Sequence, residues 1–202
     1  MAALIEEIIP EQGFEIVGNK IGTIIFEELS KQKELQPLRI TEELNVFSES
    51  SVPESITENL TINVLFDSAN YGSISEKDAQ GKTNFFIDVY TTGVETDGVP
   101  GDVDSAKRLH KFLGLCRYIL QSSKYKILGF PAGLIGGTYV ESIETLPPAQ
   151  KQDSAFTRFG RITFGVKIQE NQKLWEGVLL SQSDSNIKLQ LTEQGYKYNY
   201  TR

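Results

Sequence analysis

Apolar residues recur at helical spacing in two segments of the chain. Between residues 14 and 32 they fall on one face of a predicted helix, whose beginning is weakened by Gly18 and Gly22. A stronger helix is predicted over 104–123, with Asp102 or Asp104 as its N-cap. The first stripe contains Val17, Ile21, Ile24, Ile25 and Leu29; the second contains Ala106, Leu109, Leu113, Cys116 and Leu120, widened by Phe112 and Ile119. We expect both stripes to be buried against a sheet.

Four further segments alternate between apolar and polar residues, which predicts strands with one buried face. They pair most simply as two antiparallel hairpins, the first joined by a polar loop at 67–83 and the second by one at 147–157. Both loops exceed the usual hairpin length. The strands lie at 59–67, 83–93, 138–146 and 158–169; their apolar positions include Leu60, Ile62, Val64, Phe66, Phe85, Ile87, Val89, Ile162, Phe164, Val166 and Ile168.

Two stretches outside these elements differ in character. Residues 32–59 show little periodicity, are interrupted by Pro37 and Pro53, and include a predicted loop, "FSESSVPES". The last 30 residues alternate again, at Ile187, Leu189, Leu191, Tyr196, Tyr198 and Tyr200. They predict a small β extension over 174–202, after a main domain over 1–173. The predicted class is α+β: a mostly antiparallel sheet of about four strands, two main helices on one face and the C-terminal extension.

The segment "GFPAGLIGG" at 129–137 raises the possibility of a phosphate-binding loop. Such a loop needs a Lys and a Ser or Thr at the start of a helix, and a dinucleotide fingerprint needs a strand, then glycines, then a helix. Here "TYV" follows Gly137 and opens a strand. The glycines are therefore interpreted as a structural connection.

Composition excludes several classes of protein. The net charge of −7 and the pI near 4.9 speak against a general nucleic-acid binder, although a local basic surface is compatible with an acidic total. The single cysteine, Cys116, excludes an intramolecular disulfide and a cysteine-based zinc site. The N-terminus lacks a basic signal-peptide region and no apolar run approaches membrane-spanning length. We expect a soluble protein made in the cytoplasm.

Residues suited to catalysis or metal binding are few. The single histidine, His110, lies among Lys107, Arg108 and Lys111, one position beyond a core residue, and is expected on the surface. Asp97, Asp102 and Asp104 do not match a calcium-loop pattern. We expect no enzyme activity, no cofactor and no metal site.

Three charged residues on predicted strands are the candidate interface residues: Asp88, Arg158 and Arg161. Asp88 lies among apolar neighbours and is expected to face solvent or another subunit. Arg158 and Arg161 belong either to a solvated sheet face with weak salt bridges or to an intersubunit or lumen-facing pair. The sequence leaves both interpretations open.

The order of elements over residues 14–170 resembles the tail terminator (tail-completion or neck) proteins of long-tailed bacteriophages. The resemblance rests on the N-terminal helix, a hairpin whose second strand reads "FFIDVYTTG", the amphipathic helix "SAKRLHKFLGLCRYIL" and two strands ending in "RITFGVKI". Family members have a strand of this alternation before the long helix and a similar late strand. This chain is longer than the shorter members, with extended loops and the β extension.

The resemblance implies a homo-hexameric ring in the virion, without a catalytic site. One ring face would meet the last tail-tube ring, the other the head-completion or connector protein, and DNA would pass through the lumen without specific binding. The loops at 67–83 and 147–157 would then be mobile in the isolated subunit and protected in the tail. Another neck or head–tail joining protein, a non-viral α+β adaptor and an enzyme with unrecognised residues remain the alternatives.

Overall fold

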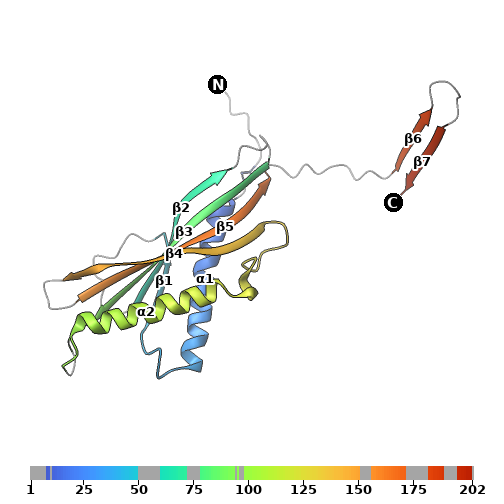
Figure 1. The fold of residues 1–202 in the computed structure, drawn as a ribbon. Coiled ribbons are helices and arrows are strands. Elements are labelled where there is room, and N and C mark those ends of the chain that lie inside the picture. Colours follow the sequence, from blue (N-terminus) through green and yellow to red (C-terminus); the bar gives the residue numbers. More distant parts are fainter. Residues whose placement is uncertain are drawn as a thin grey trace. The chain divides into compact units, whose positions relative to one another are not determined.

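The computed structural model describes residues 8–9, 11–49, 60–71, 78–93, 95, 98–150, 156–171, 182–188 and 195–201. The chain divides into two compact units, Met1–Glu170 and Asn171–Arg202, and each is described by itself. The first unit is an α+β domain of two helices and a five-stranded sheet (Figure 1). The predicted fold class is therefore confirmed, with one strand more than expected.

Helix α1 spans Gly13–Leu35, and its apolar stripe is buried as predicted: Val17, Ile21, Ile24, Ile25 and Leu29 are almost completely inaccessible. The backbone N–H of Gln12 donates a hydrogen bond of 2.6 Å to Glu15 Oε2, which satisfies one of the free donors at the helix start. Gly18 lies against the sheet, where an added Cβ would come within 3.3 Å of the Phe85 ring. The absence of a side chain at Gly18 therefore lets the helix approach β3 closely.

Helix α2 spans Gly101–Leu120 and is followed by a short 3₁₀ helix, η1, at Ser123–Tyr125. Its predicted stripe is buried at Leu109, Leu113, Cys116 and Leu120. The predicted N-cap is wrong, because Pro100 occupies that position and both Asp102 and Asp104 lie in the first turn. Acidic side chains there still favour the helix, since the N-terminal end of its dipole is positive.

The sheet has the order β1-β2-β3-β5-β4. Strand β1 (Leu44–Ser48) pairs in parallel with β2 (Leu60–Tyr71), so the sheet is mixed, and β2 pairs antiparallel with β3 (Asp78–Gly93). Strand β4 (Ile135–Gln150) pairs antiparallel with β5 (Phe156–Asn171). The sequence did not indicate β1, because this five-residue strand is at most half-buried and therefore lacks clean alternation.

Both hairpins are longer than predicted, and the loops are correspondingly shorter. Residues 67–71 and 78–83 belong to β2 and β3, while 147–150 and 156–157 belong to β4 and β5. The strands continue beyond the apolar core, where alternation fades but backbone pairing persists. Residues 72–77 and 151–155 lie outside the described residues, so the expected mobility of these loops stays a prediction.

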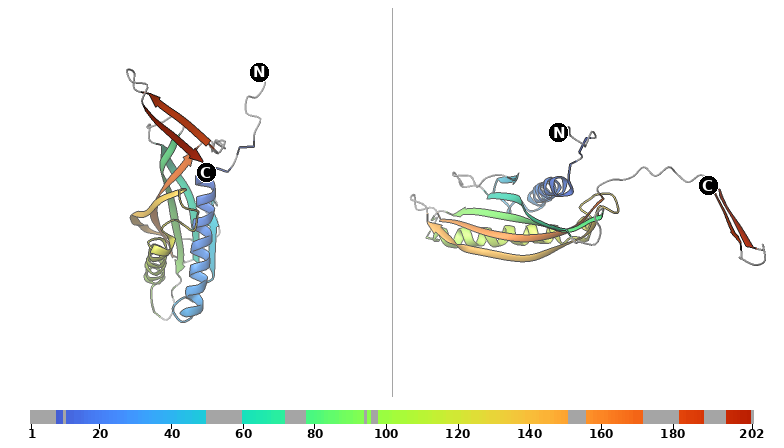
Figure 2. Two further views of the ribbon diagram at one scale, coloured as in Figure 1. Left: turned by 90° about the vertical axis from the view of Figure 1, so that its right-hand side faces the viewer. Right: turned by 90° about the horizontal axis from the view of Figure 1, so that it is seen from above.

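Both helices pack on one face of the sheet. Gly18 of α1 faces Phe85 on β3, and Leu113 of α2 faces Gly160 on β5. Phe85, Ile87 and Val89 of β3 join Ile162, Phe164, Val166 and Ile168 of β5 in a single core with the helix stripes. Figure 2 gives two further views of this arrangement. The opposite face of the sheet, here called the open sheet face, carries no helix within the described ranges.

The glycine-rich segment connects η1 to β4, as expected of a structural connection. Gly129 has a φ of +74° and Gly133 a φ of +106°, values that side-chain-bearing residues rarely adopt. Strand β4 begins at Ile135, so Gly129 and Gly133 precede a strand, Gly136 and Gly137 lie within it, and none of the four opens a helix. This order differs from that of the known phosphate-binding loops.

The second unit contains a two-stranded antiparallel hairpin. Strand β6 (Gln182–Lys188) pairs with β7 (Gly195–Thr201) in a register that places Ile187 opposite Tyr196 and Ser185 opposite Tyr198. The predicted C-terminal β extension is therefore confirmed. Leu189 and Leu191, which belonged to the predicted alternation, lie outside the described residues.

Candidate interaction surfaces

The open sheet face contains two of the three candidate residues, and the structure brings them together. Arg161 on β5 donates two hydrogen bonds to Asp88 on β3, of 2.7 Å from Nε to Oδ1 and 2.8 Å from an Nη to Oδ2. The Asp88 carboxylate is 1% exposed, whereas the Arg161 side chain is 34% exposed. This bidentate geometry is the strong form of an Arg–carboxylate pair. The hydrogen bonds to Asp88 raise the pKa of Arg161.

Aromatic rings enclose the arginine. The Arg161 guanidinium lies 4.0 Å from the centre of the Phe86 ring and 5.4 Å from that of Phe159. Phe159 in turn stacks on Tyr90, with ring centres 4.8 Å apart. Burial and the nearby Asp88 charge raise the pKa of Tyr90 to about 12, so its hydroxyl is neutral at physiological pH. At the middle of the open sheet face, the Arg161 guanidinium therefore lies within a cluster of three aromatic rings, those of Phe86, Phe159 and Tyr90.

The position of Asp88 differs from the expectation that it faces solvent or another subunit. It is buried by side chains of its own chain, because the arginine that pairs with it is supplied by the adjacent strand β5. Phe86 and Phe159 were not selected from the sequence as site residues. Strand alternation was the signal that could have found them, since each lies two positions from Asp88 or Arg161 and so on the same face.

Arg158 does not share a surface with Arg161, because the two lie at an odd spacing on one strand and point to opposite faces. Arg158 Nε donates a hydrogen bond of 3.1 Å to the backbone carbonyl of Asp102, and its guanidinium lies 3.9 Å from the Asp102 carboxylate. Arg158 therefore ties β5 to the first turn of α2. Whether any of the three candidates lies at an interface stays a prediction.

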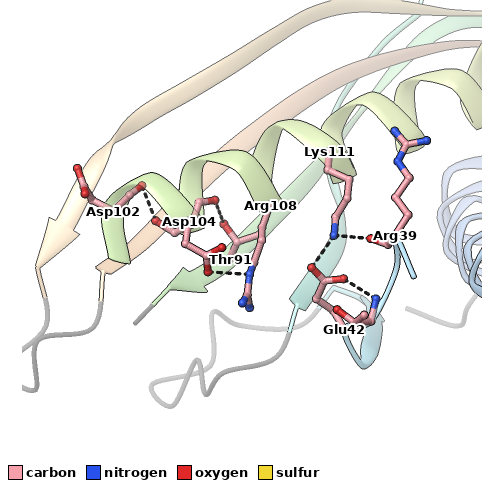
Figure 3. A network of polar contacts seen from close by, with 9 residues as sticks. Arg39, Glu42, Thr91, Asp102, Asp104, Arg108 and Lys111 are labelled. Carbon is pink, nitrogen blue, oxygen red and sulfur yellow. Dashed lines mark hydrogen bonds and ion pairs between the residues drawn. The ribbon is translucent and has the colours of Figure 1, made fainter. Parts of the chain in front are cut away.

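Further polar contacts hold α2 in place (Figure 3). Lys111 donates hydrogen bonds of 2.6 Å to Glu42 Oε1 and 2.9 Å to the Arg39 carbonyl, both in the segment that follows α1. Thr91 on β3 donates a hydrogen bond of 2.9 Å to the Ser105 carbonyl. Arg108 pairs with Asp104 one helical turn earlier, at 2.9 Å. The Lys111 and Thr91 contacts attach α2 to the rest of the domain, whereas the Arg108–Asp104 pair lies within the helix and supports it locally.

A groove of about 400 Å³ lies between α1 and the edge strand β1. Its lining mixes polar and apolar side chains, and the large Phe26 ring at its wall is 48% exposed. The residues that line it are Asn19, Gly22, Thr23, Phe26, Glu27, Val46 and Ser48. The groove therefore offers an apolar contact beside a carboxylate rather than a set of converging catalytic groups.

The residues with catalytic potential are separated from one another. His110 lies on the exposed side of α2, as expected, whereas Cys116 is fully buried on its inner side and burial raises the pKa of the thiol to about 12. Within the described ranges, no group of three His, Cys, Asp or Glu side chains is placed to hold a metal ion. Likewise, no described helix is long and apolar enough to cross a membrane.

Comparison with known proteins identifies no family. No protein-family model and no curated protein matches the chain. Among solved structures, the chain is similar to a chain in the virion of a native gene transfer agent particle, with a TM-score of 0.44 and 12% sequence identity. That match covers 74% of this chain and 94% of the other chain.

Proposed function

We propose that the protein is a structural subunit of a phage-type virion, which forms a homo-hexameric ring at the end of the tail tube and joins it to the head-completion or connector protein. The observation that carries this proposal is the open sheet face. In the described part of the chain, both helices cover the same side of the five-stranded sheet, and the other side exposes Arg161 within an aromatic setting. Arginine and aromatic residues are enriched where proteins bind one another.

The order of elements along the chain supports the same role. The long helix α2 lies between the β2–β3 and β4–β5 hairpins, which is the arrangement of the tail terminator proteins that the sequence resembles. In such a ring DNA passes through the lumen, and the net charge of −7 suits a lumen that does not retain DNA tightly. Location in the virion, after synthesis in the host cytoplasm, follows from this role.

The proposed role is non-catalytic and needs no cofactor. The single histidine is exposed on α2 and the single cysteine is buried, and no side chain within the described ranges forms a hydrogen bond or ion pair with either, as a nucleophile or a general base would require. Thermal-shift assays against nucleotides and divalent metal ions should give no specific stabilisation. A rise of several degrees with one ligand would contradict this part of the proposal.

Mass measurement and electron microscopy test the ring. Size-exclusion chromatography with light scattering, alone and with purified tail tubes, should give a species of six subunits or tubes capped by a ring. A monomer under both conditions would overturn the proposal. Binding to connector protein but never to tubes would instead favour another neck protein, and rings that bind neither would favour a non-viral adaptor.

A single substitution tests the open sheet face. Leu146 lies opposite Phe159 on this face and is 53% exposed, so Leu146→Glu should weaken binding to tail tubes or connector without unfolding the domain. Leu38→Glu is the matched control, because Leu38 is 97% exposed in the segment after α1, outside the sheet. Equal binding by the two variants would show that this face is not the contact surface.

A further inference from the structure

Positive charge is concentrated in one part of an acidic chain. Residues 105–140 contain six lysines and arginines and no aspartate or glutamate, although the whole chain has a net charge of −7. This part comprises most of α2, then η1 and the glycine-rich connection. Such asymmetry favours contact with an acidic surface over simple solubility.

The outer side of α2 presents this charge to solvent. Lys107, His110, Gly114, Arg117 and Tyr118 recur at helical spacing on the exposed side, and we call them the α2 outer stripe. Arg108 and Lys111 already have carboxylate partners, whereas Lys107 and Arg117 form no ion pair within the described residues. Tyr118 is 81% exposed, so its ring is accessible to a partner surface.

Gly114 is a second and independent sign of contact. It lies in the middle of the outer stripe, where glycine disfavours a helix, and no atom of the described residues lies within 4 Å of the position that its Cβ would take. Nothing in the described part of the chain therefore requires a glycine there. A partner surface that closely approaches the helix between His110 and Tyr118 would require one.

A complementary surface exists on the other helix. The outward side of α1 carries Glu15, Glu27 and Glu34 together with Lys31, which pairs with Glu34 at 2.7 Å, so its net charge is negative. The groove between α1 and β1 exposes the Phe26 ring beside Glu27. We call Glu15, Thr23, Phe26, Glu27 and Glu34 the α1 outer surface. Its charge is opposite to that of the α2 outer stripe, and its groove can accept an aromatic side chain.

We infer that the α2 outer stripe of one copy packs against the α1 outer surface of the next copy, with Tyr118 in the groove beside Phe26 and Arg117 near Glu27. Helix α1 contacts β1 and β2 at one edge of the sheet, whereas α2 contacts β3 and β4 towards the other. The contact is therefore between two different surfaces and repeats from copy to copy. Repeats of this kind close into a ring when the rotation permits.

This inference rests on the proposed self-association and names the surfaces that produce it. Phosphate groups of DNA would also attract the basic stripe, but they would leave the exposed Phe26 ring and its groove unexplained. A second copy of this chain would explain the α2 outer stripe, the α1 outer surface and the lack of a side chain at position 114. DNA binding is accordingly an outcome that the experiment distinguishes.

Charge reversal on each surface tests the contact. Arg117→Glu and Glu27→Arg should each weaken subunit association at least tenfold in sedimentation velocity or light scattering, because each places like charges together. The double variant Arg117→Glu/Glu27→Arg should recover most of the association. Lys126→Glu is the matched control, since Lys126 is exposed just after η1, outside the open sheet face and both named helix surfaces, and its reversal changes the net charge by the same amount. It should associate like the parent protein.

Cysteine cross-linking locates the contact directly. Tyr118→Cys combined with Thr23→Cys should form disulfides between copies under mild oxidation, whereas either single variant should not form the same ladder of products. The native Cys116 is buried and does not compete.

Failure of the inference and failure of the proposed function give different results. Rings from the parent protein that persist in Arg117→Glu without loss of affinity would overturn the inference and leave the ring intact. A parent protein that never self-associates would overturn both. Loss of DNA binding rather than of self-association in Arg117→Glu would assign the stripe to nucleic acid and also overturn the inference.

Discussion

Helices α1 and α2 resemble each other on the side that packs against the sheet and differ on the side that faces solvent. Each buries a stripe of apolar residues against the same face of the sheet, and each contains glycine within its length. In α1 the glycines face inward, where Gly18 meets Phe85, whereas Gly114 of α2 faces outward. Apolar periodicity therefore determines how a helix joins its own domain, and the residues outside that stripe determine what the domain can meet.

The largest effect is expected on the inner side of α2. Leu113→Ala should lower the free energy of unfolding by about 2 to 5 kcal/mol, because Leu113 is 4% exposed and its truncation leaves a cavity beside Gly160. Denaturant unfolding measures the change. Lys107→Ala, on the outer side of the same helix, is the control and should stay within about 0.5 kcal/mol. Equal midpoints for Leu113→Ala and the parent would mean that the stripe is not core.

A smaller effect should distinguish the two kinds of glycine. Gly18→Val should destabilise the protein by about 1 to 3 kcal/mol, since its methyl groups would overlap the buried Phe85 ring. Gly114→Val makes the same chemical change where no atom lies within 4 Å, and should shift stability by less than about 0.5 kcal/mol. Thermal melts of both variants provide the comparison, and a similar loss in each would contradict it.

Gly114→Ala should separate stability from assembly. Alanine favours a helix over glycine by about 1 kcal/mol, so the isolated subunit should become more stable by up to that amount. Its methyl group would meanwhile obstruct the inferred contact, so subunit association should weaken. Unfolding under dissociating conditions and sedimentation at high concentration measure the two effects. A variant that is both more stable and fully associated would argue against close approach at Gly114.

The smallest effect concerns thiol reactivity on the inner side of α2. Cys116 is fully buried and its pKa is raised to about 12, so almost no thiolate exists near neutral pH. A thiol reagent such as 5,5′-dithiobis(2-nitrobenzoate) should react at pH 8 only after denaturant unfolds the domain. Rapid reaction of the native protein would show that the α2 stripe opens readily, unlike the stripe of α1.

The sequence predicted those parts of the fold that have strong periodicity. Both helices and four strands of the sheet follow from apolar residues that are in fact buried, such as Ile21, Ile87 and Ile162. Strand β1 was missed because its five residues pair at the edge of the sheet without a buried face of their own. The outer parts of the hairpins were missed for a related reason, since backbone pairing there does not depend on an apolar side.

The candidate site was only partly predictable. Alternation places Asp88 on the face opposite Ile87, but its partner lies 73 positions later in the sequence. Only the pairing of β3 with β5, which are separated by α2, brings Arg161 to it. The odd spacing of Arg158 and Arg161 does predict that they point to opposite faces of β5, but it does not indicate which residue pairs with either of them.

The Asp88–Arg161 pair also bears on how the chain avoids misfolded sheets. A slip of two residues between β3 and β5 would keep every apolar side chain on the core face, so burial alone does not forbid it. Such a slip would remove the arginine from a carboxylate that is 1% exposed and leave a charge without compensation. The pair therefore specifies the register between β3 and β5, the two strands through which the hairpins join. Pairings shifted by two residues would keep the apolar face buried but would be less stable, because Asp88 would lose its arginine.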